Sequence, residues 1–354
     1  MSFKKNREKQ YLVFGYFGFV TNQLDGQTIK TRNVYKLLKD NCTGPVHYSD
    51  TQQFRHGLKP IFQFFKYLVT CDYLVILPCL NNLKTLFPVL YVLSKIFNYQ
   101  IIHIGIGGWH DKYLKQWPLV RNMLGEVRIN LLETEITVER LRSQFKYTNV
   151  AVFPNFRFDE CLHKSKSGKS GTINLVFMAR VNMKKGLDTL ADLCGLIFRD
   201  SYSNKLTLTI YGPIGSDEDK EYLQKEIVDK YEFVVYGGAL SPDRINETLS
   251  NYDIFLFPTH YFTEGFPGSI LDAYNAGIPV LATAWEHARQ FVSDGVTGYV
   301  VDFENPVPEL YNHIKHLCDS PEELWKMKLA AYNESRKYTP SSAWKILKQY
   351  IDHA

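Results

Sequence analysis

Short apolar runs, rich in β-branched and aromatic residues, recur along almost the whole chain and alternate with segments of helical pattern. Near-continuous apolar runs are typical of strands that are buried on both faces, as in parallel sheets covered by helices. The pattern therefore predicts an α/β fold with parallel sheets. The predicted strands cover residues 11–14, 73–77, 100–104, 129–132, 150–153, 174–178, 206–210, 233–236, 254–257 and 279–282.

The length of 354 residues favours two domains over a single core. A Ser-, Gly- and Lys-rich stretch at 163–171 is the best candidate for a linker between them. We predict an N-terminal domain over residues 1–160, a linker over 161–172 and a C-terminal domain over 173–335. Both domains are expected to be Rossmann-like and to face each other, with ligand bound at the carboxyl ends of their strands.

Cysteine usage and hydropathy exclude several classes of protein. Six cysteines without a C-x-x-C pair indicate reduced thiols of a cytosolic protein, not a metal site or a disulfide framework. The apolar run after the basic N-terminal residues is short and lacks a cleavage site, which favours a first strand over a signal peptide. The most lipid-like segment, residues 86–97, is too short to cross a bilayer. These features predict a cytoplasmic protein.

Charge is divided unevenly along the chain. Residues 1–150 hold 20 Lys+Arg and 10 Asp+Glu, whereas residues 151–354 hold 21 and 27. The basic half predicts that the first domain faces an anionic membrane, on the inner face of the cell membrane, because no nucleic-acid-binding motif is present. The segment 54–67 mixes bases and aromatics and predicts an amphipathic helix after Pro60. This helix either rests on the membrane or packs by its Phe face.

The stretch 263–273 combines a glycine-bearing loop with a short helical segment, directly after a predicted strand. A helix start presents unpaired backbone N–H groups, which bind phosphate. Glu264 lies in the loop, and Asp272 lies eight residues on, about two helical turns away. Carboxylates bind hydroxyls, so the combination predicts a nucleotide sugar, whose diphosphate lies between two hydroxyl-rich rings. The other interpretation is that both acids only cap and solvate the helix.

Two cations follow the strand at 174–178. Arg180 lies at the strand end and Lys185 lies in the short loop before Gly186, where a helical pattern begins. Two fixed cations five residues apart can grip both phosphates of a leaving diphosphate, because Arg offers a fork of donors and Lys a point charge. The spacing therefore predicts a diphosphate clamp.

These motifs resemble those of retaining glycosyltransferases with the GT-B fold, glycosyltransferase family 4 (glycosyl transferases group 1) in particular. The stretch 264–272 resembles the family's E-G-x-P-x-x-x-x-E region, with Asp272 for the usual second Glu. The stretch 179–186 resembles its G-R-…-K-G element, with Ala179 for its first Gly. The resemblance covers nearly the whole chain. It implies a C-terminal helix within 336–354 that crosses back to the first domain.

The resemblance also implies roles for residues outside these motifs. Gly26 lies in a strand-to-helix loop similar to the family's N-terminal glycine loop, although an ordinary turn is the other interpretation. His110-Asp111 resembles the family's H-D pair, whose His reaches the donor sugar from a loop; a surface His is the alternative. Tyr211 and Gly237, at the ends of two predicted strands, would border the nucleobase.

The implied activity is hexosyl transfer from a UDP- or GDP-sugar to a hydroxyl of a saccharide or lipid-linked saccharide, with retention of anomeric configuration, in cell-surface polysaccharide or glycolipid assembly. No cofactor and no metal are expected, and the D-x-D at 217–219 is predicted to be a solvated loop and helix start. A nucleotide-sugar epimerase and a non-catalytic GT-B partner subunit are the alternatives. The implied catalytic residues are Glu264, Arg180, Lys185 and His110, and the implied donor contacts are Gly26, Arg180, Lys185, Tyr211, Gly237, Glu264, Gly265, Phe266, Pro267, Gly268, Ser269, Ile270 and Asp272.

Overall fold

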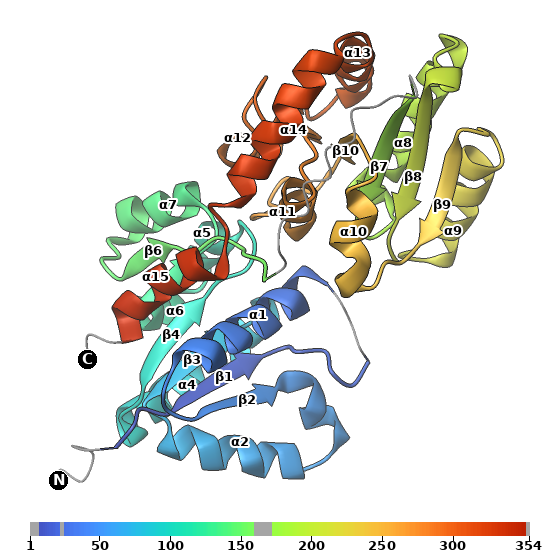
Figure 1. Cartoon of the computed structure of the whole chain (residues 1–354). Coiled ribbons are helices and arrows are strands. Elements are labelled where there is room, and N and C mark those ends of the chain that lie inside the picture. The colour runs from blue at the N-terminus through green and yellow to red at the C-terminus, as the bar shows by residue number, and fades with distance from the viewer. Residues whose placement is uncertain (1–6, 22–24, 159–171, 352–354) are drawn as a thin grey trace. The chain divides into compact units, whose positions relative to one another are not determined.

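The computed structural model describes residues 7–21, 25–158 and 172–351, and these form two compact units (Figure 1). The first unit contains the described residues up to Phe158 together with those from Thr339 onward, and the second runs from residue 172 to Tyr338. The linker predicted at 161–172 lies outside the described residues, apart from residue 172. The C-terminal segment therefore belongs to the same unit as the N-terminal domain.

The first unit is a parallel sheet of six strands in the order β2-β1-β3-β4-β5-β6. The core on one face of the sheet includes residues of two helices, α1 (Gly26–Asn41) and α15 (Pro340–Ile351). The core on the other face includes residues of four helices, α2 (Lys59–Thr70), α4 (Phe87–Phe97), α6 (Pro118–Gly125) and α7 (Glu135–Phe145). Short helices η1 (Thr51–His56), α3 (Leu80–Thr85) and α5 (His110–Leu114) lie in the connections. The strands are β1 (Tyr11–Gly15), β2 (Val46–Asp50), β3 (Tyr73–Leu77), β4 (Gln100–Ile104), β5 (Ile129–Leu132) and β6 (Val150–Val152).

The second unit repeats this architecture with the strand order β12-β11-β10-β7-β8-β9, again all parallel. One face of the sheet is covered by two helices, α8 (Leu187–Arg199) and α13 (Pro306–Asp319). The other face is covered by α10 (Ile245–Leu249), α11 (Gly268–Asn275) and α12 (Ala288–Phe291). The strands are β7 (Ile173–Met178), β8 (Leu206–Tyr211), β9 (Val234–Gly238), β10 (Ile254–Phe257), β11 (Val280–Thr283) and β12 (Gly298–Val301); the remaining helices include α9 (Asp217–Tyr222) and α14 (Pro321–Ser335).

The predicted α/β class with two parallel sheets is confirmed, and all ten predicted strands form within two residues of their expected bounds. Among the described residues, β2 and β12 were not predicted. Both are edge strands. The sequence of β2, Val46-His47-Tyr48-Ser49-Asp50, lacks the continuous apolar run of a central strand because one side of an edge strand meets water.

Helix α15 packs against the first sheet, where Ala343, Leu347 and Ile351 join the core. The Tyr73 hydroxyl donates to the Ile351 carbonyl at 2.7 Å, which ties the last turn to β3. The helix begins at Pro340, four residues after the start of the predicted segment 336–354, because the Thr339 hydroxyl accepts from the Ser342 N–H at 3.2 Å and caps the first turn.

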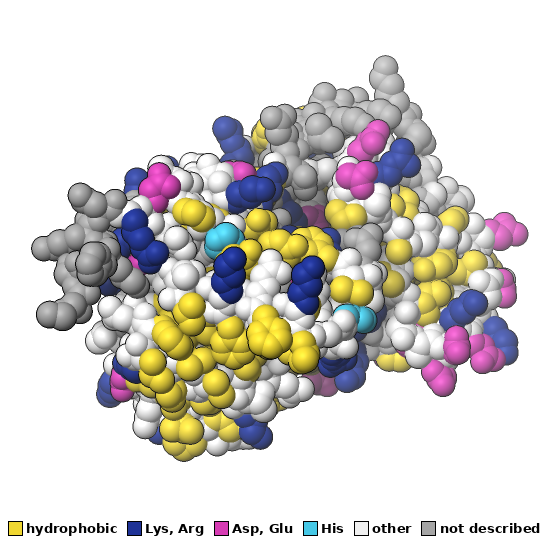
Figure 2. All heavy atoms as spheres, turned by 90° about the horizontal axis from the view of Figure 1, so that it is seen from below, with side chains coloured by type: hydrophobic (Ala, Val, Ile, Leu, Met, Phe, Trp, Pro, Cys, Tyr) yellow, Lys and Arg dark blue, Asp and Glu magenta, His cyan; other side chains and the backbone are white. Residues whose placement is uncertain are grey.

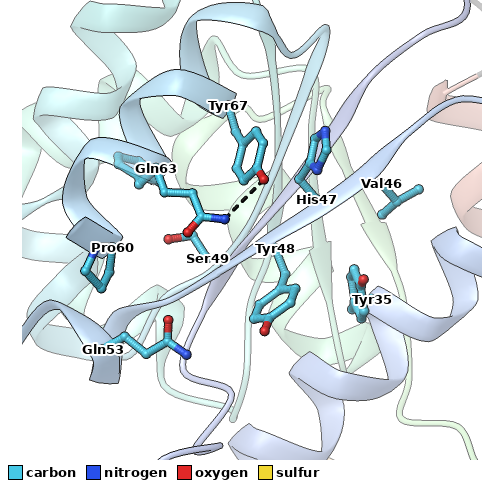
Figure 3. Close-up of a pocket in the computed structure, with 10 residues that line it drawn as sticks. Tyr35, Val46, His47, Tyr48, Ser49, Gln53, Pro60, Gln63 and Tyr67 are labelled. Carbon is cyan, nitrogen blue, oxygen red and sulfur yellow. Dashed lines mark hydrogen bonds between the residues drawn. The ribbon is translucent and has the colours of Figure 1, made fainter. Parts of the chain in front are cut away.

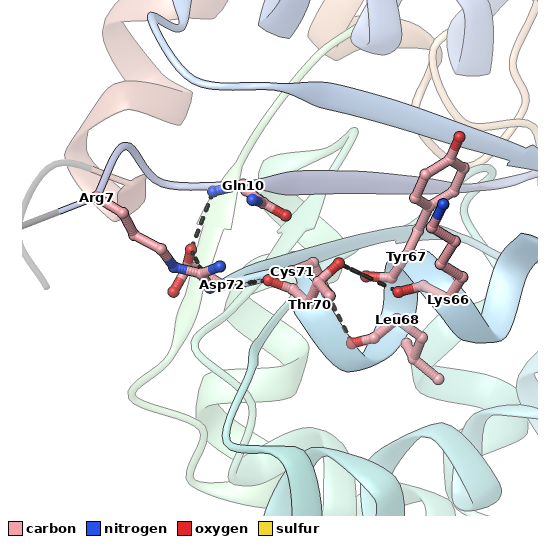
Figure 4. A network of polar contacts seen from close by, with 8 residues as sticks. All are labelled: Arg7, Gln10, Lys66, Tyr67, Leu68, Thr70, Cys71 and Asp72. Atoms are coloured by element: carbon pink, nitrogen blue, oxygen red, sulfur yellow. Dashed lines mark hydrogen bonds and ion pairs between the residues drawn. The ribbon is translucent and has the colours of Figure 1, made fainter. Parts of the chain in front are cut away.

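Polar contacts hold the chain just before β1 at the amino ends of the strands (Figure 4). Arg7 donates to the Thr70 carbonyl at 2.9 Å and pairs with Asp72 at 3.5 Å. The same carboxylate accepts from the Gln10 N–H at 3.0 Å. These bonds fasten β1 to the α2–β3 connection and leave the opposite, carboxyl ends of the strands for ligand binding. Across the described residues, no helix has the length and apolar character needed to span a bilayer.

Candidate active site

The start of α11 lies at the carboxyl end of β10, a strand buried along its whole length. Its N-cap, Pro267, has no side chain that can accept a hydrogen bond, so helix geometry leaves the amides of Gly268 and Ser269 without an intrahelical acceptor. The loop before it is held in place by Phe266, which is buried and stacks on Phe291 at 4.1 Å. Two N–H groups and the positive end of the helix dipole have the chemistry that suits an anion, and the predicted diphosphate contact stays a prediction.

Two of the predicted donor contacts, Phe266 and Ile270, are 2% and 0% exposed and belong to the core of the second unit. Their side chains pack inward because they anchor the loop and the first turn of α11. Only their main-chain groups can therefore face a ligand.

Lys185 and Glu264 come together although 79 residues separate them in the sequence. The Lys185 ammonium donates to a Glu264 carboxylate oxygen, and the two side chains are 26% and 14% exposed. Arg180, two residues after the end of β7, is exposed. The predicted clamp and the predicted sugar-binding acid therefore share the carboxyl edge of the second sheet.

Gly186 explains how Lys185 reaches this position. Its φ of +87° is in the left-handed region, and a Cβ at this position would lie 1.9 Å from the Pro258 carbonyl oxygen. Only glycine allows the chain to pass so close to the end of β10. Just before it, the Asn182 side chain accepts from the Lys185 N–H at 3.0 Å and fixes the turn.

The loop after β10 supplies residues that the sequence did not single out. The His260 N–H donates to the Lys184 carbonyl at 3.0 Å, and its Nε2 lies 2.9 Å from Asp188 Oδ1 and 3.1 Å from Thr189 Oγ1. His260 therefore joins the loop that carries Glu264 to the start of α8. Its position three residues after a predicted strand is the signal that could have identified it.

An exposed aromatic ring borders the ion pair. Tyr261 is 45% exposed, and its ring centroid lies 5.7 Å from Lys185 Nζ. The Glu264 N–H donates to the Tyr261 carbonyl at 3.3 Å. Burial lowers the pKa of Lys185 to about 8, and the positive charge of Arg180 is the second cause of this shift. Contact with the Glu264 carboxylate acts in the opposite direction, because it favours the charged ammonium.

Tyr211 and Gly237, predicted to border the nucleobase, contact each other. A Cβ on Gly237 would lie 2.2 Å from Tyr211 Cε1, so the ring fills the space above the glycine. The Tyr211 hydroxyl lies 2.9 Å from that of Tyr252, and burial, followed by this contact, raises the pKa of Tyr211 to about 12. Asp272 lies on α11 and is 7% exposed, which places it inside the unit rather than on a solvated helix surface.

The expectation that His110 lies in a loop or at the surface is wrong. His110 begins α5 and is 1% exposed, with its ring stacked on Trp109 at 4.0 Å. The imidazole fills the space that a side chain at Gly105 would occupy, since a Cβ there would lie 2.5 Å from its Nε2. Burial, and then His103, hold the pKa of His110 well below its usual range. Its predicted contact with the donor sugar stays a prediction.

Lys30 and Glu133 form an ion pair of 2.7 Å next to this glycine loop, with side chains 2% and 3% exposed. Glu133 also accepts from the Gly107 N–H at 3.0 Å, so the pair fixes the loop between β4 and α5. Neither residue was predicted from the sequence; the position of Glu133 directly after β5 was the available signal.

Gly26 is the first residue of α1, and its backbone lies beside open space. Asp25 caps the helix by accepting from the Thr28 N–H at 2.9 Å. The preceding residues 22–24 lie outside the described residues. The predicted contact of Gly26 with the donor therefore stays a prediction. The D-x-D at 217–219 forms the first turn of α9, as expected.

Residues 172–320 match the family model described as glycosyl transferases group 1. The chain is 29% identical over 182 residues to an uncharacterized 41.2 kDa protein in the cps region of Klebsiella pneumoniae, covering 50% of this chain and 47% of that protein. It is 26% identical over 223 residues to the capsular polysaccharide biosynthesis glycosyltransferase CapM of Staphylococcus aureus, covering 60% of this chain and 52% of that protein. The chain thus spans about half the length of these curated relatives.

Among solved structures, Anabaena HepE in complex with UDP and glucose aligns with a TM-score of 0.75 at 14% identity, covering 98% of this chain and 100% of that one. At this identity the likeness concerns the fold. Both six-stranded parallel sheets are included in the alignment, given its coverage. Residues 172–320 therefore resemble the glycosyl transferases group 1 family, and the chain as a whole has the GT-B fold.

Proposed function

We propose that the protein is a glycosyltransferase that moves a hexose from a UDP- or GDP-sugar to a hydroxyl of a saccharide or lipid-linked saccharide, with retention of anomeric configuration. One observation carries the proposal: Lys185 meets Glu264, which lies in the loop that leads into the uncapped start of α11. The cation and the N–H donors would bind the diphosphate of a sugar nucleotide, and the carboxylate would bind the hydroxyls of its sugar. These are the two chemical groups on either side of the bond that breaks.

In this reaction the bond between the anomeric carbon and the diphosphate oxygen breaks, and its electron pair leaves with the diphosphate. Arg180, Lys185 and the amides of Gly268 and Ser269 stabilise the charge that develops there. Glu264 accepts hydrogen bonds from the sugar hydroxyls. The acceptor oxygen bonds to the anomeric carbon, and its proton passes to an oxygen of the departing diphosphate, so no side-chain base is required.

Asp272 is proposed to hold the ribose, directly or through a water, and Tyr211 with Gly237 to border the base. The cations and the helix start take the place of a metal ion, and no resident cofactor is involved. HepE has been crystallised with UDP and glucose, and CapM is named for capsular polysaccharide biosynthesis. HepE supports a nucleotide-sugar donor, and CapM supports a role in the assembly of a cell-surface polysaccharide.

The direct test is a thermal-shift series with UDP, GDP, ADP and their hexose conjugates, followed by product analysis by mass spectrometry with and without saccharide acceptors. Stabilisation by one nucleoside diphosphate and acceptor-dependent transfer in EDTA are expected. Donor conversion without acceptor would instead identify an epimerase, and binding without turnover a partner subunit. Loss of transfer in EDTA, restored by Mn²⁺ or Mg²⁺, would contradict the metal-independent mechanism.

The affinity for the nucleoside diphosphate is expected to fall as pH rises above 8. Lys185 is charged below its pKa of about 8 and loses its proton above it, whereas a bound diphosphate favours the charged form. Isothermal titration at pH 7, 8 and 9.5 should show Kd rising by at most about tenfold per pH unit, with proton uptake on binding. Lys185→Arg keeps its charge over this range and should flatten the profile. An unchanged wild-type Kd at pH 9.5 would exclude Lys185 from the clamp.

We also propose that the first unit docks on the inner face of the cell membrane, in line with a cytoplasmic protein. An apolar face is exposed on α2 and α4, and both helices pack on the same side of the first sheet. Figure 2 shows hydrophobic side chains gathered over part of one face, with Lys and Arg side chains near them. The face consists of Leu58, Phe62, Phe65, Val69, Val89, Val92, Ile96 and Phe97, which are 36–71% exposed. Single exposed apolar residues are ordinary, but a contiguous group beside bases marks an interaction surface.

Co-sedimentation with vesicles is expected to be stronger on anionic than on neutral lipid and weaker at high salt. Lys59→Gln and Lys66→Gln should each weaken binding about fivefold, the equivalent of about 1 kcal/mol per base. Phe62→Ser should weaken binding to both lipid types, whereas Phe198→Ser, equally aromatic and 57% exposed on the second unit, should not. Equal recovery on neutral and anionic vesicles would contradict the electrostatic part of the proposal.

A further inference from the structure

A cavity of about 170 Å³ opens at the free edge of the first sheet, between α1, β2 and α2 (Figure 3). Tyr35 lines it from α1, Gln63 and Tyr67 from α2, and His47, Tyr48 and Ser49 from β2. None of the functional residues discussed above contributes to it. The cavity is bounded by secondary structure and not by loops alone, so its walls are held by the fold.

The edge of β2 supplies main-chain hydrogen-bonding groups to this cavity. The Tyr11 N–H donates to the Pro45 carbonyl, and the parallel register pairs Tyr11 with Val46 and Val13 with Tyr48. In such a ladder the main-chain groups of alternate residues point toward the partner strand. Those of Val46 and Tyr48 therefore point away from the sheet, where they can bond to a ligand.

The side chains around the cavity are aromatic or uncharged and polar. His47 and Tyr67 stack at 3.9 Å with their planes 6° apart, and Tyr35 meets Tyr48 at 5.3 Å. The Gln63 amide donates to the Tyr67 hydroxyl at 3.1 Å. Among the described residues, the lining contains no Lys, Arg, Asp or Glu. Burial, and then the nearby charge of Lys66, lower the pKa of His47 and so disfavour a charged imidazole.

This chemistry selects among ligands. A phosphate or a nucleotide would find no cation in the cavity, and an acyl chain would leave amide and hydroxyl groups unpaired. A sugar ring offers apolar C–H faces to aromatic rings and hydroxyls to amides, phenols and main-chain groups. The volume is below the 300–1,000 Å³ typical of sites for larger ligands, which suits a single ring.

We propose that this cavity binds one neutral sugar residue of a saccharide, at a site distinct from the nucleotide-sugar site of the second unit. By helix periodicity, Pro60, Gln63 and Tyr67 form one stripe of α2, and Phe62 and Val69 of the apolar face form another, with Lys59 and Lys66 between them. A sugar in the cavity would thus lie beside the proposed membrane-docking face. That it belongs to the glycan of the acceptor rests on the proposed function.

Saturation-transfer NMR on the full chain tests the proposal, with methyl glucoside, methyl galactoside and N-acetylglucosamine as probes. At least one should receive saturation from the protein with UDP present in excess. Gln63→Ala and Tyr67→Phe should each weaken its binding by roughly two- to tenfold, the range for one lost hydrogen bond. Tyr67→Phe keeps the stack on His47, and an unchanged Tm would show that the fold is intact. Gln349→Ala, which removes an exposed amide on α15, is the control.

Glu264→Gln separates this site from the donor site. Saturation transfer should persist in this variant if the sugar occupies the cavity. Transfer that Glu264→Gln or UDP abolishes, and that Gln63→Ala leaves intact, would place the sugar in the donor site and overturn the inference, while the proposed function would stand. Absence of saturation transfer to all three probes in the wild-type protein would also overturn it. Failure of the proposed function would instead appear as absence of nucleotide binding, whatever the result with these sugars.

Discussion

Arg180→Ala and Lys185→Ala are each expected to lower kcat/KM for sugar transfer by roughly 10²-fold or more. The diphosphate gains charge as the glycosidic bond breaks, and a donor aimed at that charge contributes more in the transition state than in the bound substrate. Lys185 is held for this task by the Asn182 turn and the close passage of Gly186, and contacts Glu264 in the ligand-free protein. Removal of its ammonium would also leave the Glu264 carboxylate without this partner.

The matched control is Lys184→Ala, one residue away. Its main-chain carbonyl accepts from the His260 N–H, but its side chain is exposed, so loss of the ammonium should change kcat/KM by less than about threefold. Steady-state kinetics of nucleoside diphosphate release would measure all three variants. Turnover of both Arg180→Ala and Lys185→Ala within about threefold of wild type would remove the clamp from the mechanism.

Gly186→Ala is expected to lower the free energy of unfolding by about 2–4 kcal/mol and to impair activity. The left-handed φ of +87° disfavours alanine, and the new methyl group would lie 1.9 Å from the Pro258 carbonyl oxygen, so the turn or the end of β10 must shift. Because Lys185 precedes this glycine, the same shift would move its ammonium away from Glu264. Urea denaturation followed by circular dichroism would measure the stability.

Alanine substitutions at two other glycines distinguish the effect of backbone strain from the effect of the close contact with Pro258. Gly238 has a similar φ of +76° but open space around its Cβ position, so Gly238→Ala reports the backbone strain alone. Gly26 has open space and lies at the start of α1, so Gly26→Ala should be neutral or slightly stabilising, since alanine favours helix. If Gly186→Ala lowers the free energy of unfolding by no more than Gly238→Ala does, the close approach of Gly186 to Pro258 does not contribute to stability.

The candidate site shows what can be inferred from local patterns. The strand–loop–helix at 254–275 and the Arg180–Lys185 spacing are sequence features, because a strand end and a helix start lie within a few residues of each other. That Lys185 meets Glu264 could not be derived in this way. The contact depends on β10 pairing with β7, which brings the loops that follow both strands to one edge of the sheet.

His110 shows the opposite case. Its position after Gly105 and Gly107 suggested an accessible loop, yet the ring is buried because the missing side chain of Gly105 leaves a space that the imidazole fills. A glycine in a sequence indicates that another group can pack closely against the backbone, but it does not identify that group. For the same reason the roles of Lys30 and Glu133, 103 residues apart, became visible only once α1 and β5 were placed in one unit.

The sequence by itself determined the fold class and the central strands, because hydrophobic periodicity and turn residues act over a few neighbouring positions. The chemistry expected at the α11 start stays a prediction. The tertiary structure decided which face of α2 and α4 stays exposed, where the edge strands lie, and which distant charges pair. These depend on the order of strands in each sheet. Strand order is set by packing between elements far apart in the chain, which no local pattern records.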